Sequence, residues 1–243
     1  MANEDFDIDR LAAYLHLMPA EVLKLAERDK LPGRKVGGAW RFSAAEIHHW
    51  MEERIGLSDE DELQSVEGAL HRHGQHAEDE EVSIAQLLHV EAIAVPMLAR
   101  SRHSVITKVT ELAEATHLLW DAAAMAEAVR AREAMHSTAL DNGVALLHPR
   151  RPLGNILAEA VLALGITPSG IPFSRPGESG AGGRLTDVFF LICSTSEHEH
   201  LRILARLSRV INDATFLSDL RAATDPVAAR ELIVSRESVV RDS

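Results

Sequence analysis

Residues 1–56 favour three short helices and one β-hairpin, judged from the spacing of their apolar and polar positions. The first helix begins at Asp7 or Asp9, Pro19 opens the second, and Ser43 caps the third. Between the second and third helices, the Gly37-Gly38 pair predicts a tight turn that joins two strands. The pattern places these apolar residues on buried faces: Leu11, Leu15, Leu17, Val22, Leu23, Ala26, Ile47 and Trp50.

Beyond residue 83 the pattern indicates a larger domain that contains both helices and strands. Up to about residue 135 it is rich in helix, and helical spacing recurs at Leu118, Leu119, Trp120, Ala124 and Val129. Two apolar runs, residues 144–147 and 187–193, then predict buried strands, and an amphipathic helix follows the second run. Such alternation is typical of a sheet covered by helices, so we predict an α/β (α+β) protein.

An acidic segment separates these two parts. Residues 57–83 carry 1 basic and 9 acidic side chains, which is −8 of the total net charge of −12. A polar, like-charged stretch with few apolar residues is predicted to be a solvated linker. We therefore predict a domain over 1–56, a linker over 57–83 and a second domain over 84–243. The linker histidines His71, His73 and His76 lack a defined fourth ligand, and no metal site is predicted.

Composition narrows the class of protein further. The acidic N-terminus lacks an apolar signal region, and no stretch approaches 18 uncharged apolar residues, so we expect a cytoplasmic protein without membrane insertion. Cys193 is the only cysteine, which excludes an internal disulfide, and its apolar surroundings predict a buried, inert thiol. The negative net charge argues against a nucleic-acid surface that extends over the whole chain.

Two histidines are the main candidates for chemistry. His148 follows the apolar run 144–147 at a predicted turn, where we expect an exposed and oriented imidazole that can act as a nucleophile near neutral pH. His200 lies at the start of the helix that follows the second run. The glycine-rich stretch 177–184 lacks the Lys-Ser or Lys-Thr pair of a phosphate-binding loop, so no nucleotide or other cofactor is predicted.

Several separated motifs support a specific assignment of the second domain. In order along the chain they are Arg132-Glu133, Ser137-Thr138, Asn142-Gly143, His148 and His200-Leu201. This order, over residues 84–238, resembles the fructose/mannitol (nitrogen-regulatory) type of enzyme IIA domain of the bacterial phosphotransferase system, with a mixed sheet flanked by helices. Leu147 stands where that family usually has proline. Leucine at this position removes the fixed φ angle of proline and adds a backbone N–H group.

The resemblance implies roles for individual residues of this chain. His148 would accept a phosphoryl group from the phosphohistidine of a phosphocarrier protein, His200 would lie beside it, and Arg132 would help to bind the phosphoryl group. Thr138 and Asn142 would shape the approach without reacting.

The first domain also resembles a known family. Its order of helix, proline-initiated helix, Leu-Pro, basic hairpin, Trp-Arg-Phe and helix is similar to that of excisionase/MerR-like winged helix-turn-helix domains. In such domains the second helix enters the major groove and the hairpin contacts phosphates. A single copy binds DNA weakly, so useful affinity requires a dimer or tandem sites. The candidate DNA contacts are Lys24, Arg28, Arg34, Lys35 and Arg41.

Three functional hypotheses follow. The first is a regulator in which phosphorylation of His148 alters DNA binding by the N-terminal domain. The second is a phosphoryl carrier that passes phosphate to a membrane sugar permease component and uses the N-terminal domain only for docking. The third is a binding protein in which Leu147 has spoiled the loop, so that His148 is never phosphorylated.

Overall fold

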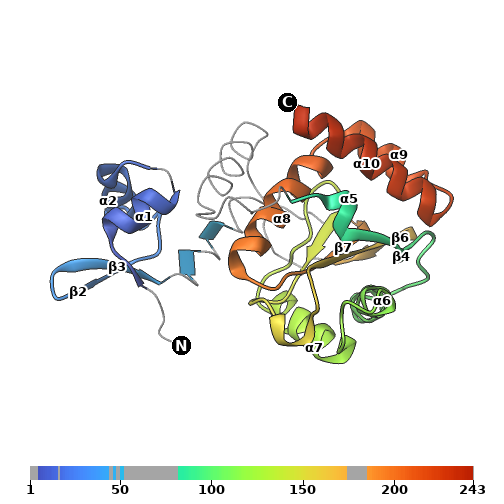
Figure 1. Ribbon diagram of the computed structural model, residues 1–243, viewed down its shortest axis with the longest axis horizontal. Coiled ribbons are helices and arrows are strands. Elements are labelled where there is room, and N and C mark those ends of the chain that lie inside the picture. Colours follow the sequence, from blue (N-terminus) through green and yellow to red (C-terminus); the bar gives the residue numbers. More distant parts are fainter. Residues whose placement is uncertain are drawn as a thin grey trace. The chain divides into compact units, whose positions relative to one another are not determined.

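The computed structural model describes residues 5–15, 17–43, 46–47, 50–51, 82–173 and 185–242. The chain divides into two compact units, residues 1–81 and 82–243. Figure 1 shows the elements of each unit. The predicted linker lies almost entirely outside the described residues, as do the linker histidines and the glycine-rich stretch 177–184.

The described residues 5–43 of the first unit form two helices and a three-stranded antiparallel sheet with the strand order β1-β3-β2. Residues 46–47 and 50–51 are also helical, in agreement with the predicted third helix. In chain order the elements are β1 (Asp5–Phe6), α1 (Ile8–Leu15), α2 (Pro19–Glu27), β2 (Arg34–Val36) and β3 (Ala39–Ser43).

Local chemistry accounts for these boundaries. Asp7 is the residue that caps α1, because its Oδ1 accepts a hydrogen bond of 2.9 Å from the backbone N–H of Arg10. Pro19 occupies the first turn of α2 as predicted. Gly37 and Gly38 have φ angles of 59° and 84°, which only glycine adopts readily, and they form the turn between β2 and β3.

The second unit begins with α5 (Ile84–Leu87) and β4 (Leu88–Ala94). Three helices follow its last strand, whereas the sequence predicts continued alternation of strands and helices. Between β4 and the C-terminus lie α6 (Arg102–Ala115), α7 (Ala122–Glu133), β5 (Val144–Leu147), the short helix η1 (Gly154–Ile156), β6 (Val161–Pro172), β7 (Leu185–Cys193), α8 (Glu197–Ile211), α9 (Ala214–Arg221) and α10 (Pro226–Asp242).

The sheet of this unit is mixed and has the strand order β4-β6-β7-β5. β4 runs parallel to β6, β6 runs antiparallel to β7, and β7 runs parallel to β5. Because β5 and β7 are parallel, their carboxyl ends lie side by side at the same end of the strands. The predicted mixed sheet flanked by helices is confirmed.

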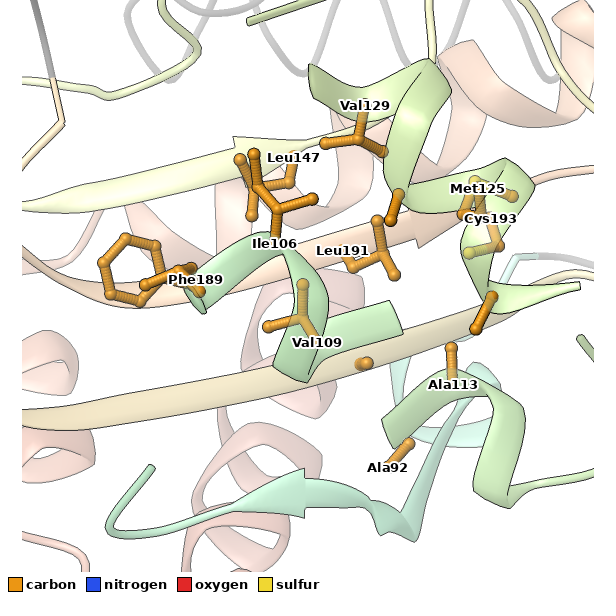
Figure 2. Packing of buried hydrophobic residues seen from close by; sticks show 14 of the residues in the cluster. Ala92, Ile106, Val109, Ala113, Met125, Val129, Leu147, Phe189, Leu191 and Cys193 are labelled. Atoms are coloured by element: carbon orange, nitrogen blue, oxygen red, sulfur yellow. The ribbon is translucent and has the colours of Figure 1, made fainter. Parts of the chain in front are cut away.

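Helices cover both faces of this sheet (Figure 1). α6 and α7 lie on one face, and α8 and α10 pack on the other side against β7 and β4. Figure 2 shows the core on the first face, where Ile106 and Val109 of α6 and Val129 of α7 meet side chains of β5 and β7. Leu147 and Phe189 belong to this core and are fully buried.

One expectation from the helical spacing is wrong. Residues 118–120 precede α7 rather than forming part of it: Leu119 pairs in a β-bridge with Leu157, and Trp120 is 62% exposed. The amphipathic helix predicted after the second apolar run is α8, and its residues from His200 to Ile211 are all buried, including Arg202, Arg206 and Arg209. The strands β4 and β6 have no counterpart among the predicted elements.

The C-terminal helix is tied to the start of the unit by a buried carboxylate. Glu237 of α10 is 3% exposed and accepts hydrogen bonds from the Ser83 hydroxyl, from Ile84 N–H at 2.6 Å and from Ala85 N–H at 2.8 Å. We expect Glu237→Ala to lower the free energy of unfolding by about 2–4 kcal/mol, because it leaves buried donors without an acceptor. Urea denaturation measures this, with Glu231→Ala, at an exposed site on the same helix, as the control. Equal stabilities of the two variants would contradict the assignment.

Candidate functional site

The parallel pairing of β5 and β7 brings the two predicted histidines together. Leu147, the last residue of β5, lies opposite Leu191 of β7, so His148 emerges beside the end of β7 and the start of α8. The ring centroids of His148 and His200 are 4.8 Å apart, and the ring planes are inclined by 49°. Carboxyl ends of parallel strands are a common place for functional groups, because loops and helix N-termini meet there.

The ring orientation of His148 is fixed by its own strand. Its Nδ1 lies 2.8 Å from the carbonyl oxygen of Leu146, which can only accept a hydrogen bond. Nδ1 therefore carries the proton in this contact, and in the neutral imidazole the lone pair is on Nε2. The expectation of an exposed imidazole is wrong, since His148 is 3% exposed and His200 is 4% exposed.

His200 belongs to the first turn of α8, where a network of side chains holds the preceding loop. Ser196 caps the helix, and its hydroxyl accepts from Glu199 N–H at 3.2 Å. The Glu199 carboxylate in turn accepts from the N–H and hydroxyl of Thr195 at 2.7 and 2.8 Å. A Cβ on Gly154 would lie 2.8 Å from the Thr195 carbonyl oxygen, so this glycine permits the close approach of the loop that follows β5.

Arg132 ends α7 together with Glu133, and both are buried. Arg132 is 5% exposed, and its Nη1 donates to the carbonyl oxygen of His136 at 2.8 Å. Its Nε is buried and has no hydrogen-bond partner among the described residues. A buried guanidinium whose Nε–H group makes no other hydrogen bond is suited to binding an anion.

Glu133 is 1% exposed, and Thr138 binds it through two donors. Its Oε1 accepts from the N–H of Thr138 at 2.9 Å and also from the Thr138 hydroxyl. Burial raises the pKa of Glu133, whereas these hydrogen bonds and the charges of Arg102 and Arg132 act to lower it. Glu133 is absent from the residues to which the sequence assigned a role, although the Arg-Glu pair ahead of Ser-Thr marks its place in the motif.

Thr138 and Asn142 both precede β5 and contact it at different ends. The carbonyl oxygen of Thr138 accepts from Leu146 N–H at 3.2 Å, close to the end of the strand that carries His148. Asn142 lies before the start of the strand, where its side chain donates to the Ile211 carbonyl and accepts from Val144 N–H, both at 3.2 Å. The structure therefore places Thr138 near the end of the strand that carries His148 and Asn142 at the opposite end.

The basic candidates of the first unit differ in their surroundings. Lys24 on α2 and Arg28, the residue directly after α2, are exposed, as are Arg34 and Lys35 on β2, whereas Arg41 on β3 is partly buried. The Arg34 guanidinium is paired with the carboxylate of Asp5 at 2.9 Å. The Lys35 ammonium lies 5.2 Å from the Trp40 ring centroid, and Arg41 donates to the Trp40 carbonyl at 3.2 Å.

Other kinds of site find little support in the described part of the chain. No group of three or more His, Cys, Asp or Glu side chains there is placed to hold a metal ion. Cys193 is fully buried, and burial raises the pKa of its thiol to about 12, as expected of an inert cysteine. Among the described helices, none is long and apolar enough to cross a membrane.

Comparison with protein families identifies both units. A family described as "Phosphoenolpyruvate-dependent sugar phosphotransferase system, EIIA 2" matches residues 86–235, and a family described as "Helix-turn-helix domain" matches residues 6–55. The first match covers more than half of the chain. The chain therefore belongs to the EIIA type 2 family and carries in addition a helix-turn-helix domain. The two resemblances drawn from the sequence are confirmed.

Solved structures share the fold of the second unit. The nitrogen regulatory protein IIA-Ntr from Neisseria meningitidis is 22% identical with a TM-score of 0.54, and the match covers 62% of this chain and 98% of that protein. Enzyme IIA mannitol from Escherichia coli, solved in complex with phosphorylated enzyme IIB, is 16% identical with a TM-score of 0.52, covering 61% and 99%. A crystal structure of IIA mannitol from the same organism gives 16% and 0.51, covering 60% and 97%. No curated protein matches the chain.

Proposed function

We propose that this protein is a phosphotransferase-system-linked regulator in which His148 accepts a phosphoryl group from a phosphocarrier histidine protein. The observation that carries the proposal is the pair His148 and His200, 4.8 Å apart between ring centroids, with Nδ1 of His148 hydrogen-bonded to a backbone carbonyl. This arrangement directs the nucleophilic lone pair to Nε2. Family membership and the helix-turn-helix domain support the remaining parts of the proposal.

The chemistry requires no cofactor. Nε2 of His148 forms a bond to phosphorus as the bond between phosphorus and the donor imidazole nitrogen breaks, and the donor imidazole leaves with the electron pair of that bond. The proton on Nδ1 of His148 stays in place. The transition state spreads charge over the phosphoryl oxygens, so the task of the protein is alignment and stabilisation of that charge. His200 and Arg132 are the groups that we assign to this task.

The burial of both imidazoles bears on this chemistry. Their exposed fractions of 3% and 4% limit access of water to the reaction centre, which protects a phosphohistidine from hydrolysis. The donor histidine must also reach Nε2 of His148, so neighbouring groups have to move as the complex forms.

The experiment that tests the proposal is phosphorylation of the full chain by phosphoenolpyruvate in the presence of the general phosphotransferase proteins. We expect intact mass spectrometry to detect one added phosphoryl group. A chain that gains no phosphoryl group while a known enzyme IIA is labelled in the same mixture would favour the binding-only hypothesis.

The regulatory part of the proposal is that phosphorylation of His148 changes DNA binding by the N-terminal domain. A phosphoryl group adds about 1.5 to 2 negative charges at neutral pH, which is enough to alter an electrostatic contact. The test is to compare binding of a DNA site, selected from random duplexes with the full chain, by phosphorylated and unphosphorylated protein. Equal affinities at low salt would contradict the coupling.

The alternative is a carrier that passes the phosphoryl group to a sugar permease component, with the N-terminal domain for docking only. It is favoured by the likeness in fold to the Escherichia coli mannitol enzyme IIA, which has been solved together with phosphorylated enzyme IIB. Incubation of the phosphorylated chain with IIB domains separates the two proposals. Rapid loss of the label to a IIB domain would favour the carrier.

Within the N-terminal domain we expect Lys35 to contribute more to DNA binding than Arg34. The Arg34 guanidinium is already paired with the Asp5 carboxylate, whereas the exposed Lys35 ammonium stacks on Trp40. Lys35→Gln should lower the slope of log affinity against log salt by about 1. Arg34→Gln should change it less, as measured by fluorescence anisotropy over a salt series. The reverse order would contradict this assignment.

A further inference from the structure

A continuous series of contacts links the end of α7 to the imidazole of His148. Glu133 accepts the N–H and hydroxyl of Thr138, and the carbonyl oxygen of Thr138 accepts Leu146 N–H at 3.2 Å. The carbonyl oxygen of Leu146 then accepts Nδ1–H of His148 at 2.8 Å. Leu146 is therefore held by Thr138 through its N–H group and orients His148 through its carbonyl oxygen.

The same segment also contacts Arg132. The His136 carbonyl that accepts from the Arg132 guanidinium lies two residues before Thr138. Ala139, one residue after Thr138, forms an antiparallel bridge with Ala145 of β5. Fixing Thr138 therefore constrains both the contact that holds Arg132 and the strand that holds His148.

The chemistry of Glu133 is unusual for a residue with only a packing role. A carboxyl group that is 1% exposed is costly to bury, and burial raises its pKa. One oxygen takes both Thr138 donors, while Oε2 is buried without a hydrogen-bond partner among the described residues. An apolar side chain could fill this space, but it could not accept the two donors.

We infer that Glu133 is a positioning residue for phosphoryl transfer: through Thr138 and Leu146 it holds His148 in the Nδ1–H tautomer and orientation. Glu133 acts on His148 only through these contacts and does not react itself. The inference rests on the proposed function for its kinetic consequence, whereas the tautomer of His148 can be measured whether or not the protein is phosphorylated.

Three variants separate the contacts of Glu133. Glu133→Ala removes the acceptor and leaves both Thr138 donors without it. Glu133→Gln keeps an Oε1 that can accept both donors and removes the charge. Thr138→Val removes the hydroxyl and keeps the backbone N–H, with a side chain of similar shape. Glu127→Ala is the matched control, because Glu127 lies on the same helix with an 81% exposed side chain.

The first readout is the tautomer of His148, measured by long-range ¹H–¹⁵N NMR on the full chain at a pH of about 8.5, two units above the ordinary histidine pKa. We expect the wild type, Glu133→Gln and Glu127→Ala to show Nδ1–H. Glu133→Ala should show a mixture of both tautomers, and Thr138→Val a smaller change in the same direction. An Nδ1–H signal unchanged in both folded variants, Glu133→Ala and Thr138→Val, would overturn the inference.

The second readout is the rate of phosphorylation by the phosphorylated carrier protein. We expect Glu133→Ala to lower the rate at saturating donor by roughly 10- to 100-fold, because small misplacements of a reacting group have effects of that size. The donor concentration that gives half the maximal rate should stay the same, since no donor contact is removed. Rescue by Glu133→Gln supports the positioning role, whereas an equal loss in Glu133→Gln and Glu133→Ala would contradict it.

The two readouts distinguish the possible failures. A wild-type chain that is never phosphorylated, but whose His148 tautomer depends on Glu133, would overturn the proposed function and leave the positioning inference supported. A phosphorylated wild type whose tautomer and rate are both unaffected by Glu133→Ala would overturn the inference and leave the proposed function supported. If Glu133→Ala fails to fold, Thr138→Val decides by the same two measurements.

Discussion

Phosphorylation is expected to be lost entirely in His148→Ala. The nucleophile of the proposed reaction is Nε2 of His148, whose Nδ1 contacts the Leu146 carbonyl oxygen and whose ring lies beside that of His200. Without that nitrogen the covalent intermediate cannot form. Intact mass spectrometry after incubation with phosphoenolpyruvate and the general phosphotransferase proteins measures the effect.

A second substitution and a matched control make this result decisive. His148 is buried, so alanine leaves a cavity and a carbonyl without its donor, at a cost of about 1–3 kcal/mol. His148→Asn retains an N–H donor that can reach the Leu146 carbonyl, and we expect it to fold more stably and to remain unphosphorylated. His103→Ala, at an exposed histidine of α6, should be labelled like the wild type. Labelling of both His148 variants would assign the phosphoryl group to another residue.

Substitution of Arg132 is expected to have the next largest effect on phosphoryl transfer. Arg132→Ala should lower the rate of phosphorylation by about 10²- to 10³-fold, the range found when one preorganised donor to a developing anion is removed. The reason is that Arg132 is 5% exposed and keeps a buried Nε that binds no other described residue. Arg132→Lys should recover only part of the rate, because an ammonium cannot bind an anion in the bidentate manner of a guanidinium.

Arg130→Ala is the matched control for this prediction. Arg130 lies in the same last turn of α7, so both variants remove one positive charge from the C-terminal end of that helix. Its Nε is also buried without a hydrogen-bond partner among the described residues, but its Nη2 donates to the Thr107 hydroxyl at 2.9 Å on the side of α6, and its Nη1 lies 3.7 Å from the Glu127 carboxylate. Stopped-flow or rapid-quench rates at saturating donor give the comparison. An equal loss of rate in both variants would indicate a general electrostatic effect and contradict a specific role for Arg132.

Elements whose boundaries depend on neighbouring residues were predictable from the sequence. The cap of α1, the proline at the start of α2 and the glycine turn at residues 37–38 are all set by interactions within a few residues. The apolar runs that became β5 and β7 were also recognisable, because each is a short, continuous apolar segment bounded by polar residues. The motif order that includes Arg132-Glu133 was sufficient to identify the family.

Elements that depend on distant partners were not predictable to the same degree. β4 carries His89 and Glu91 within its apolar pattern, and its pairing with β6 joins residues more than 70 positions apart. Residues 118–120 have helical spacing, but they lie outside α7 and Leu119 forms a β-bridge with Leu157. α8 is amphipathic by sequence, and only the structure shows that its residues from His200 to Ile211 are all buried.

For the candidate site, the sequence by itself determined the types of residue and their order: a histidine at the end of a strand, a second one at a helix start, and an Arg-Glu pair upstream. Only the tertiary structure decided their arrangement. The parallel pairing of β5 with β7 sets the centroids of the two imidazole rings 4.8 Å apart, and the side chains are only 3% and 4% exposed. The tertiary structure also places Asn142 at the opposite end of β5 from His148, and it shows that Glu133 accepts a hydrogen bond from Thr138. The physical reason is that caps and turns are local, whereas strand pairing and burial depend on residues far apart in the chain.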